Sequence, residues 1–153
     1  MTRQRLTITA AITLIAALCS SLLTSCSLES SDNGDLDGMW HLRTVDTLAT
    51  GGTYDKIPEY YYWCVQGSLL VLDNKEQSSG GNYIFSFEHS GDTLRLYDPH
   101  IFSRSKGDPE LTDVEVLRPY GINALDVSFV VEKLTGSNMV LRDDSLRLYL
   151  KKF

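Results

Sequence analysis

The sequence predicts an all-β domain, an antiparallel up-and-down meander that closes into a barrel of about eight strands. Three observations predict this fold class. From residue 39 onward, apolar residues recur with a period of two, which is the period of a half-buried strand. Short turns rich in Gly, Ser and Asp separate the apolar runs, as between consecutive antiparallel strands. A long meander avoids exposed edges by closing on itself.

The individual strands follow from alternation and from the turns between them. The apolar stretch 61–73 is interrupted at Gly67-Ser68, so it is either one bulged strand or two short ones, and the total is seven or eight strands accordingly. The turn Ser90-Gly91-Asp92 joins the predicted strands 82–89 and 93–97 into a hairpin. The predicted strands cover residues 39–46, 61–73, 82–89, 93–97, 126–134, 138–142 and 145–152.

Alternation also assigns one face of each strand to the interior. In the run Tyr60-Tyr61-Tyr62-Trp63, the residues Tyr61 and Trp63 share one face, so Tyr60 and Tyr62 share the other and are predicted to be exposed. The other residues predicted to face inward are Trp40, Leu42, Thr44, Tyr83, Phe85, Phe87, Leu94, Leu96, Val127, Phe129, Val131, Met139, Leu141, Leu146, Leu148 and Leu150.

One connection, residues 98–124, breaks this rhythm and is predicted to contain one short helix. Asp108-Pro109 offers an N-cap followed by a first-turn proline, and Thr112 with Glu115 matches a capping box. Leu111, Val114 and Leu117 form an apolar stripe that can pack on a sheet or plug a barrel end. Pro119 and Gly121 end the helix.

The N-terminal segment has the layout of a secretory signal. Arg3 and Arg5 precede the uncharged apolar stretch 6–23, and Leu23-Thr24-Ser25-Cys26 resembles the lipobox of bacterial lipoproteins. The resemblance implies cleavage after Ser25 and a lipid on Cys26, hence a membrane-anchored protein of the cell envelope, most simply at the outer membrane. The alternative is a retained membrane-spanning helix, which the many Ser and Thr residues disfavour. The predicted organisation is a signal peptide over 1–25, a flexible lipidated tether over 26–36 and a barrel domain over 37–153.

The charge balance excludes one class of partner. The chain has 14 Lys and Arg against 20 Asp and Glu, a formal charge of -6, and losing Arg3 and Arg5 with the signal takes it to -8. Such an acidic chain repels the phosphate backbone, so no nucleic-acid partner is expected. With Cys26 lipidated, Cys64 is the only other cysteine of the mature chain and cannot form an internal disulfide.

A family resemblance supports the barrel. Gly38-Met39-Trp40 resembles the Gly-x-Trp motif that opens the first strand of lipocalins, whose tryptophan closes one end of an eight-stranded barrel. Together with the lipobox, the chain resembles small lipocalin-like lipoproteins of gut-dwelling anaerobes. Two family features differ: a Thr-Asp-Tyr element is missing, and Lys151, Lys152 or Arg147 stands where lipocalins place the arginine that covers the tryptophan.

Two functions are compatible with these features. The first is binding of a small apolar or glycan-derived ligand inside the barrel, with candidate ligand-binding residues Trp40, Tyr61, Trp63, Phe85, Phe87 and Phe129, although these aromatics can equally form a filled core. The second is a non-enzymatic envelope interaction protein with a solid barrel, which contacts a protein partner through Tyr60 and Tyr62.

No enzyme, cofactor or metal function is predicted. His41, His89 and His100 lack the spacing of a metal motif, and the Ser-rich stretches lack a nucleophile elbow. The two hypotheses therefore both describe a binding protein.

Overall fold

The computed structural model describes residues 33–76 and 82–153, which belong to the second of two compact units of the chain, Ser31–Phe153. The predicted signal peptide, Cys26 and most of the predicted tether lie outside the described residues. The elements are the 3-10 helices η1 (Gly34–Leu36), η2 (Arg104–Lys106) and η3 (Val114–Tyr120), and the strands β1 (Gly38–Thr47), β2 (Gly52–Asp55), β3 (Tyr61–Gln66), β4 (Leu69–Asn74), β5 (Tyr83–Ser90), β6 (Thr93–Ile101), β7 (Val127–Leu134), β8 (Asn138–Arg142) and β9 (Leu146–Lys152).

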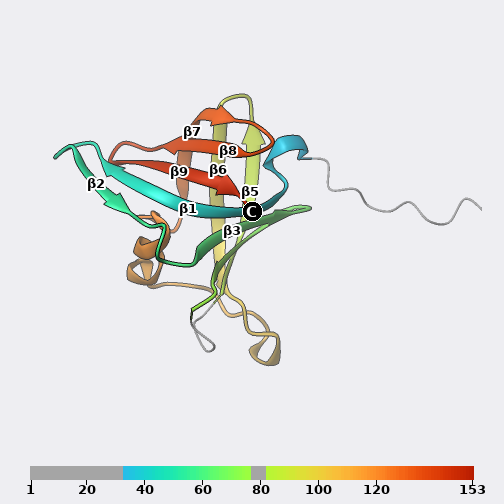
Figure 1. The fold of residues 1–153 in the computed structure, drawn as a ribbon. Helices are drawn as coiled ribbons and strands as arrows, with labels where there is room; N and C mark the ends of the chain where they lie inside the picture. Colours follow the sequence, from blue (N-terminus) through green and yellow to red (C-terminus); the bar gives the residue numbers. More distant parts are fainter. Residues whose placement is uncertain (1–32, 77–81) are drawn as a thin grey trace, which may run out of the picture. The chain divides into compact units, whose positions relative to one another are not determined.

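The predicted fold class is confirmed. All strand pairs are antiparallel, in the order β2-β1-β3-β4-β5-β6-β7-β8-β9, and pairing of β1 with β9 closes the sheet into a barrel of eight strands with β2 as an extra strand (Figure 1). The stretch 61–73 forms two strands, because Gly67 takes a φ of +61° in the tight turn between them, a conformation that favours glycine.

Strand β2 is an element that the sequence analysis did not predict. It pairs with the second half of β1, from Thr44 opposite Asp55 to Thr47 opposite Gly52, whereas β3 pairs with the first half of the same edge. The hairpin of β1 and β2 projects from the barrel on the left of Figure 1. Its strand signal is short, since only Thr53 and Tyr54 are good β formers within it.

A β-bulge in β1 changes which side chain faces the interior. The register of β1 against β9 shifts between Leu42 and Thr44, which inserts Arg43 as an extra residue. Trp40 and Leu42 face inward as predicted, but beyond the bulge Val45 points into the core in place of Thr44. The prediction for Thr44 was wrong because simple alternation does not include the extra residue.

The barrel interior is built largely from the predicted inward faces, with Val65, Leu70 and Leu72 added from a stretch whose faces were not assigned. Each strand of the closed barrel contributes at least one fully or nearly fully buried apolar side chain, so the core is continuous from one end to the other. The buried strand residues of this core are Trp40, Leu42, Val45, Trp63, Val65, Leu70, Leu72, Phe85, Leu94, Leu96, Phe129, Met139, Leu141, Leu148 and Leu150.

One end of the barrel is closed by Trp40 and η1. The indole Nε1 of Trp40 donates to the carbonyl oxygen of Leu36 at 2.8 Å, and Leu36 is itself buried, so the fold begins within the segment predicted as tether. The ammonium of Lys152 lies 4.7 Å from the centroid of the Trp40 ring and donates to the carbonyl oxygen of Asp35 at 2.8 Å. Lys152 thus takes the covering position that the resemblance left open among three residues.

The long connection between β6 and β7 contains the predicted helical segment in altered form. It is the 3-10 helix η3, and it starts at Val114, later than Asp108-Pro109 would place it. The side chain of Asp113 caps it by accepting from the Glu115 backbone N–H at 2.9 Å, so the cap is not Thr112. A second short 3-10 helix, η2, precedes it in the same connection.

Candidate functional site

The end of the barrel opposite Trp40 is covered by η3 and the residues that follow it. Leu117, Tyr120 and Ile122 are buried in the barrel core. The indole Nε1 of Trp63, on β3, donates to the carbonyl oxygen of Tyr120 at 3.2 Å, and the Tyr120 ring packs edge-on against Tyr61 at 4.9 Å. Burial raises the pKa of the Tyr120 phenol, which therefore stays neutral. We call this covering segment, residues 111–122, the plug.

The six predicted ligand-binding aromatics divide into two groups. Trp40, Trp63, Phe85 and Phe129 are 0 % exposed, so no part of their surface borders a space that a water molecule could occupy. Tyr61 and Phe87 are half-buried and pack against the same core. In this structure the four buried aromatics are part of a filled core, and a ligand could reach them only if core side chains moved.

A cleft of about 420 Å³ lies at the plugged end, between the β1–β2 hairpin and the plug. Small-molecule sites commonly occupy about 300–1,000 Å³. Val45 and Leu146 provide apolar surface in the cleft, and Tyr54 on β2 presents a ring that is 60 % exposed. Tyr54 stands directly opposite Val45 in the strand pair, so its side chain lies on the inner face of the sheet. We call this space the mouth cleft.

Polar groups of the mouth cleft come from both of its walls. Thr47 and Lys56 belong to the hairpin side, and Arg118 and Asn123 to the plug side. Lys56 is paired with Glu59 at 2.9 Å, and Arg118 with Glu115 at 2.8 Å. None of these residues was predicted from the sequence to be a site residue, because β2 was not predicted and Arg118 and Asn123 belong to no motif.

The two predicted partner-binding tyrosines differ in their exposure to solvent. Tyr60 is 48 % exposed, as predicted, but Tyr62 is only 5 % exposed, so the predicted exposure of Tyr62 was wrong. The Tyr62 ring is stacked on His41 at 4.8 Å and meets Phe153 edge-on at 5.9 Å. His41 is held by the carbonyl oxygen of Glu59, which accepts from its Nε2 at 2.9 Å, so the loop before β3 stays against this outer face.

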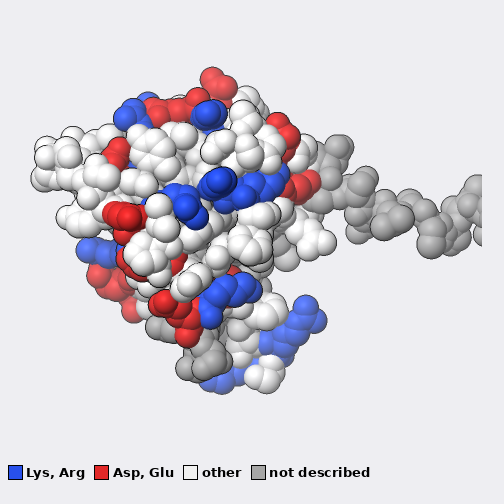
Figure 2. Space-filling model, in the orientation of Figure 1, with Lys and Arg blue, Asp and Glu red and all other residues white. Residues whose placement is uncertain are grey.

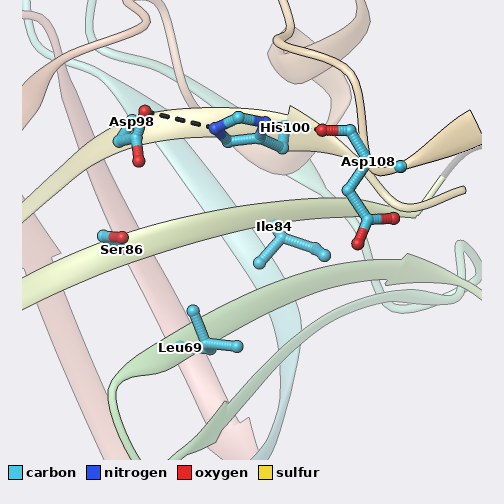
Figure 3. A pocket seen from close by; sticks show the side chains of 7 residues that line it. Leu69, Ile84, Ser86, Asp98, His100 and Asp108 are labelled. Atoms are coloured by element: carbon cyan, nitrogen blue, oxygen red, sulfur yellow. Dashed lines mark hydrogen bonds and ion pairs between the residues drawn. The ribbon is translucent and has the colours of Figure 1, made fainter. Parts of the chain in front are cut away.

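A second pocket, of about 350 Å³, lies on the outer wall of the barrel over β4, β5 and β6 (Figure 3). Leu69 and Ile84 form its apolar floor, and Asp98, His100 and Asp108 line it with charged or titratable groups. His100 donates from Nδ1 to the Asp108 carbonyl oxygen at 2.7 Å, and its Nε2 lies 3.2 Å from the Asp98 carboxylate. These two contacts, first the one to Asp108, raise the pKa of His100.

Two kinds of reactive group, a metal centre and a nucleophilic thiol, can be checked within the described residues. No cluster of three or more His, Cys, Asp or Glu residues that could hold a metal ion occurs in residues 33–76 and 82–153. The Cys64 thiol is half-buried, and burial together with the nearby Asp73 raises its pKa, so the thiol is a poor nucleophile near neutral pH. In this part of the chain no helix is long and apolar enough to cross a membrane.

Charged side chains of both signs lie on one face of the molecule. Figure 2 shows acidic and basic groups interspersed on the face that it displays. Several form ion pairs, such as Glu132 with Arg147 and Arg142. The hydrogen bond from Arg147, and then that from Arg142, lower the pKa of the Glu132 carboxyl group. Such surface pairs contribute little to stability.

Comparisons with known proteins agree with this architecture. A family model for the lipocalin-like domain matches residues 21–153. A lipocalin-like protein from Bacteroides uniformis ATCC 8492 is similar in structure, with a TM-score of 0.58 and 20 % sequence identity over 78 % of this chain and 100 % of that chain. An uncharacterized protein from Bacteroides eggerthii DSM 20697 is also similar, with a TM-score of 0.54 and 16 % identity over 76 % of this chain and 98 % of that chain. No curated protein matches the chain.

Proposed function

Because this chain belongs to the family of lipocalin-like domains, we propose that it is a lipid-anchored envelope protein that binds a small apolar or glycan-derived ligand, without catalysis. The mouth cleft is the observation that carries the proposal. It combines apolar side chains, an exposed aromatic ring and several hydrogen-bonding groups at the end of the barrel opposite the tryptophan closure. The filled interior supports a site at the mouth over one among the buried aromatics.

Ligand retention tests this proposal directly. We expect native mass spectrometry of the protein purified from its own host to reveal one small molecule per chain. Tyr54→Ala should reduce the occupancy because it removes the exposed ring from the cleft. Tyr60→Ala is the matched control, since it removes another exposed tyrosine of the same segment that does not line the cleft.

Retention of the molecule by wild type and by both variants would place the ligand elsewhere. A bare protein mass, unchanged after incubation with host envelope extract, would contradict small-ligand binding.

Anchoring through Cys26 is the second part of the proposal, and it rests on the lipobox-like sequence Leu23-Thr24-Ser25-Cys26. Acyl chains on that cysteine contribute about 0.8 kcal/mol per buried methylene, so a multiply acylated protein stays with the membrane. We expect the wild-type protein to be in the outer-membrane fraction. The Cys26→Ser variant should remain unprocessed or be released from that fraction. Acylation and membrane retention of Cys26→Ser equal to wild type would contradict the anchoring.

One observation favours the alternative of an interaction protein. Among the described residues, eight large apolar side chains are exposed, and four of them lie within residues 48–60: Leu48, Tyr54, Ile57 and Tyr60. An exposed apolar group of this kind suits contact with an envelope protein. The same pair of variants separates the two functions, because Tyr60→Ala would then reduce capture of the partner while wild type retains no small molecule.

A further inference from the structure

We propose that the ligand of the mouth cleft is a small organic anion, a molecule in which one carboxylate or phosphate is attached to an apolar or ring-shaped body. This inference rests on the proposed ligand-binding function and names the ligand class. It follows from the charges that line the cleft, from their placement on opposite walls and from the position of the apolar surface between them.

The charge of the cleft opposes that of the chain. The sequence has six more acidic than basic side chains, yet the cleft is lined by two cations, Lys56 and Arg118, and by no carboxylate. The outer-wall pocket of similar size has the opposite character, since Asp98 and Asp108 line it without Lys or Arg. A cationic lining in an acidic protein therefore distinguishes this cleft and selects for negative charge.

The two cations approach the cleft from different elements. Lys56 follows β2 on the hairpin side, where its ammonium also lies 5.4 Å from the centroid of the Tyr61 ring. Arg118 lies in η3, three residues before Gly121, whose backbone forms part of the cleft lining. An anion bound between the walls would contact a cation on each side.

Both cations have a carboxylate partner outside the cleft, and the partner of Arg118 leaves most N–H donors of its guanidinium available. Arg118 contacts Glu115 through one terminal nitrogen, although a guanidinium has five N–H donors. Both ion pairs join residues three positions apart. The Lys56–Glu59 pair is partly buried, with the Lys56 side chain 19 % exposed, whereas the Arg118–Glu115 pair is exposed, and exposed pairs contribute little to stability. A ligand anion can therefore share or replace Glu115 at small cost.

The rest of the lining defines the body of the ligand. Val45 and Leu146 contact an apolar portion, and the exposed Tyr54 ring offers a face for a planar ring or a sugar. Asn123 adds an amide that makes one long contact, from Nδ2 to the Ser145 hydroxyl at 3.4 Å. An aromatic acid, or a sugar that carries an acidic group, meets all of these requirements.

A titration with a matched pair of probes tests the charge requirement. The probes are phenylacetate and its neutral amide, phenylacetamide, which share the ring and differ in the anionic group. They are added to the full protein, as cells produce it, in mild detergent, while backbone amide NMR shifts are followed. We expect phenylacetate to shift Thr47, Gly121 and Asn123, and to bind at least about tenfold more tightly than phenylacetamide, as expected for a charge-assisted hydrogen bond.

Variants that remove one positive charge test whether the preference for phenylacetate arises in the mouth cleft. Arg118→Gln should weaken phenylacetate binding at least about tenfold. Lys133→Gln removes the same charge from an exposed position of β7, next to the closed end of the barrel, and should leave the affinity unchanged. Arg118 is exposed, so its loss should not unfold the domain.

Three results would overturn the inference: equal binding of both probes, equal affinity losses in the two variants, or no shift at these residues with phenylacetate at tens of millimolar. Its failure is distinguishable from that of the proposed function. A neutral host molecule retained in the cleft would contradict the anion requirement alone, whereas a protein that retains nothing from its host would contradict the ligand-binding function itself.

Discussion

Replacing Trp63 with alanine should lower the free energy of unfolding by about 3–5 kcal/mol, a large part of the stability of a domain of this size. The Trp63 side chain is fully buried and packs edge-on against Phe129 at a centroid distance of 5.8 Å. It also donates the hydrogen bond that ties the plug to β3 through the Tyr120 carbonyl oxygen. The substitution therefore leaves a cavity and removes the donor for a buried acceptor at once.

Chemical denaturation with two further variants checks this prediction. Trp63→Phe keeps an aromatic ring in the core, so it should cost less than Trp63→Ala while still losing the hydrogen bond to the plug. Tyr60→Ala, which alters an exposed aromatic nearby in the sequence, should change stability by about 0.5 kcal/mol or less. A loss below about 1 kcal/mol for Trp63→Ala would show that the plug and the barrel are not packed as described.

Gly121→Ala should cost about 2–5 kcal/mol, because the position allows neither the backbone conformation nor the volume of alanine. Gly121 ends η3 with a φ of +80°, and its N–H donates to the carbonyl oxygen of Arg118 at 2.9 Å. A Cβ atom there would lie 2.6 Å from a terminal methyl carbon of Leu148. Leu148 is fully buried in the barrel, so it cannot move aside freely.

Gly107→Ala separates the two causes. Gly107 has a φ of +73°, but a Cβ atom at that position would have no heavy atom within 4 Å. The control variant therefore carries only the backbone strain of about 1–2 kcal/mol. We expect denaturation midpoints to show a clearly larger loss for Gly121→Ala, with the excess reporting the contact between plug and barrel. Equal losses would mean that the core accommodates the added methyl group.

Most of the barrel could be predicted because the patterns that determine its strands involve residues close together in sequence. Alternation along Phe85, Phe129 and Leu148 assigned these side chains to the interior, and each is fully buried. Gly38-Met39-Trp40 located the closed end of the barrel, since the tryptophan packs there against η1 and Lys152. Such features depend on neighbours two residues apart or on a motif with a fixed structural role.

The parts that could not be predicted depend on contacts between distant segments. The exposure of Tyr62 was mispredicted because His41, from another strand, and Phe153, from the end of the chain, cover its ring. The bulge at Arg43 moved Val45 inward without a local sequence signal. The mouth cleft joins β2 to a plug more than fifty residues away in sequence, so no spacing within either segment indicates it.

Strands β2 and β3 pair with different halves of the same edge of β1, so β2, which lines the mouth cleft, is not one of the strands that close the barrel. Barrel closure uses the pairs β1–β3 and β1–β9, and neither requires β2. The β1–β2 turn and β2 can therefore change in length or sequence while the hydrogen-bonded cylinder stays intact. In evolution or in engineering, the β1–β2 turn and β2 could be exchanged together, and their replacement would change the lining of the mouth cleft while β1 keeps its pairs with β3 and β9.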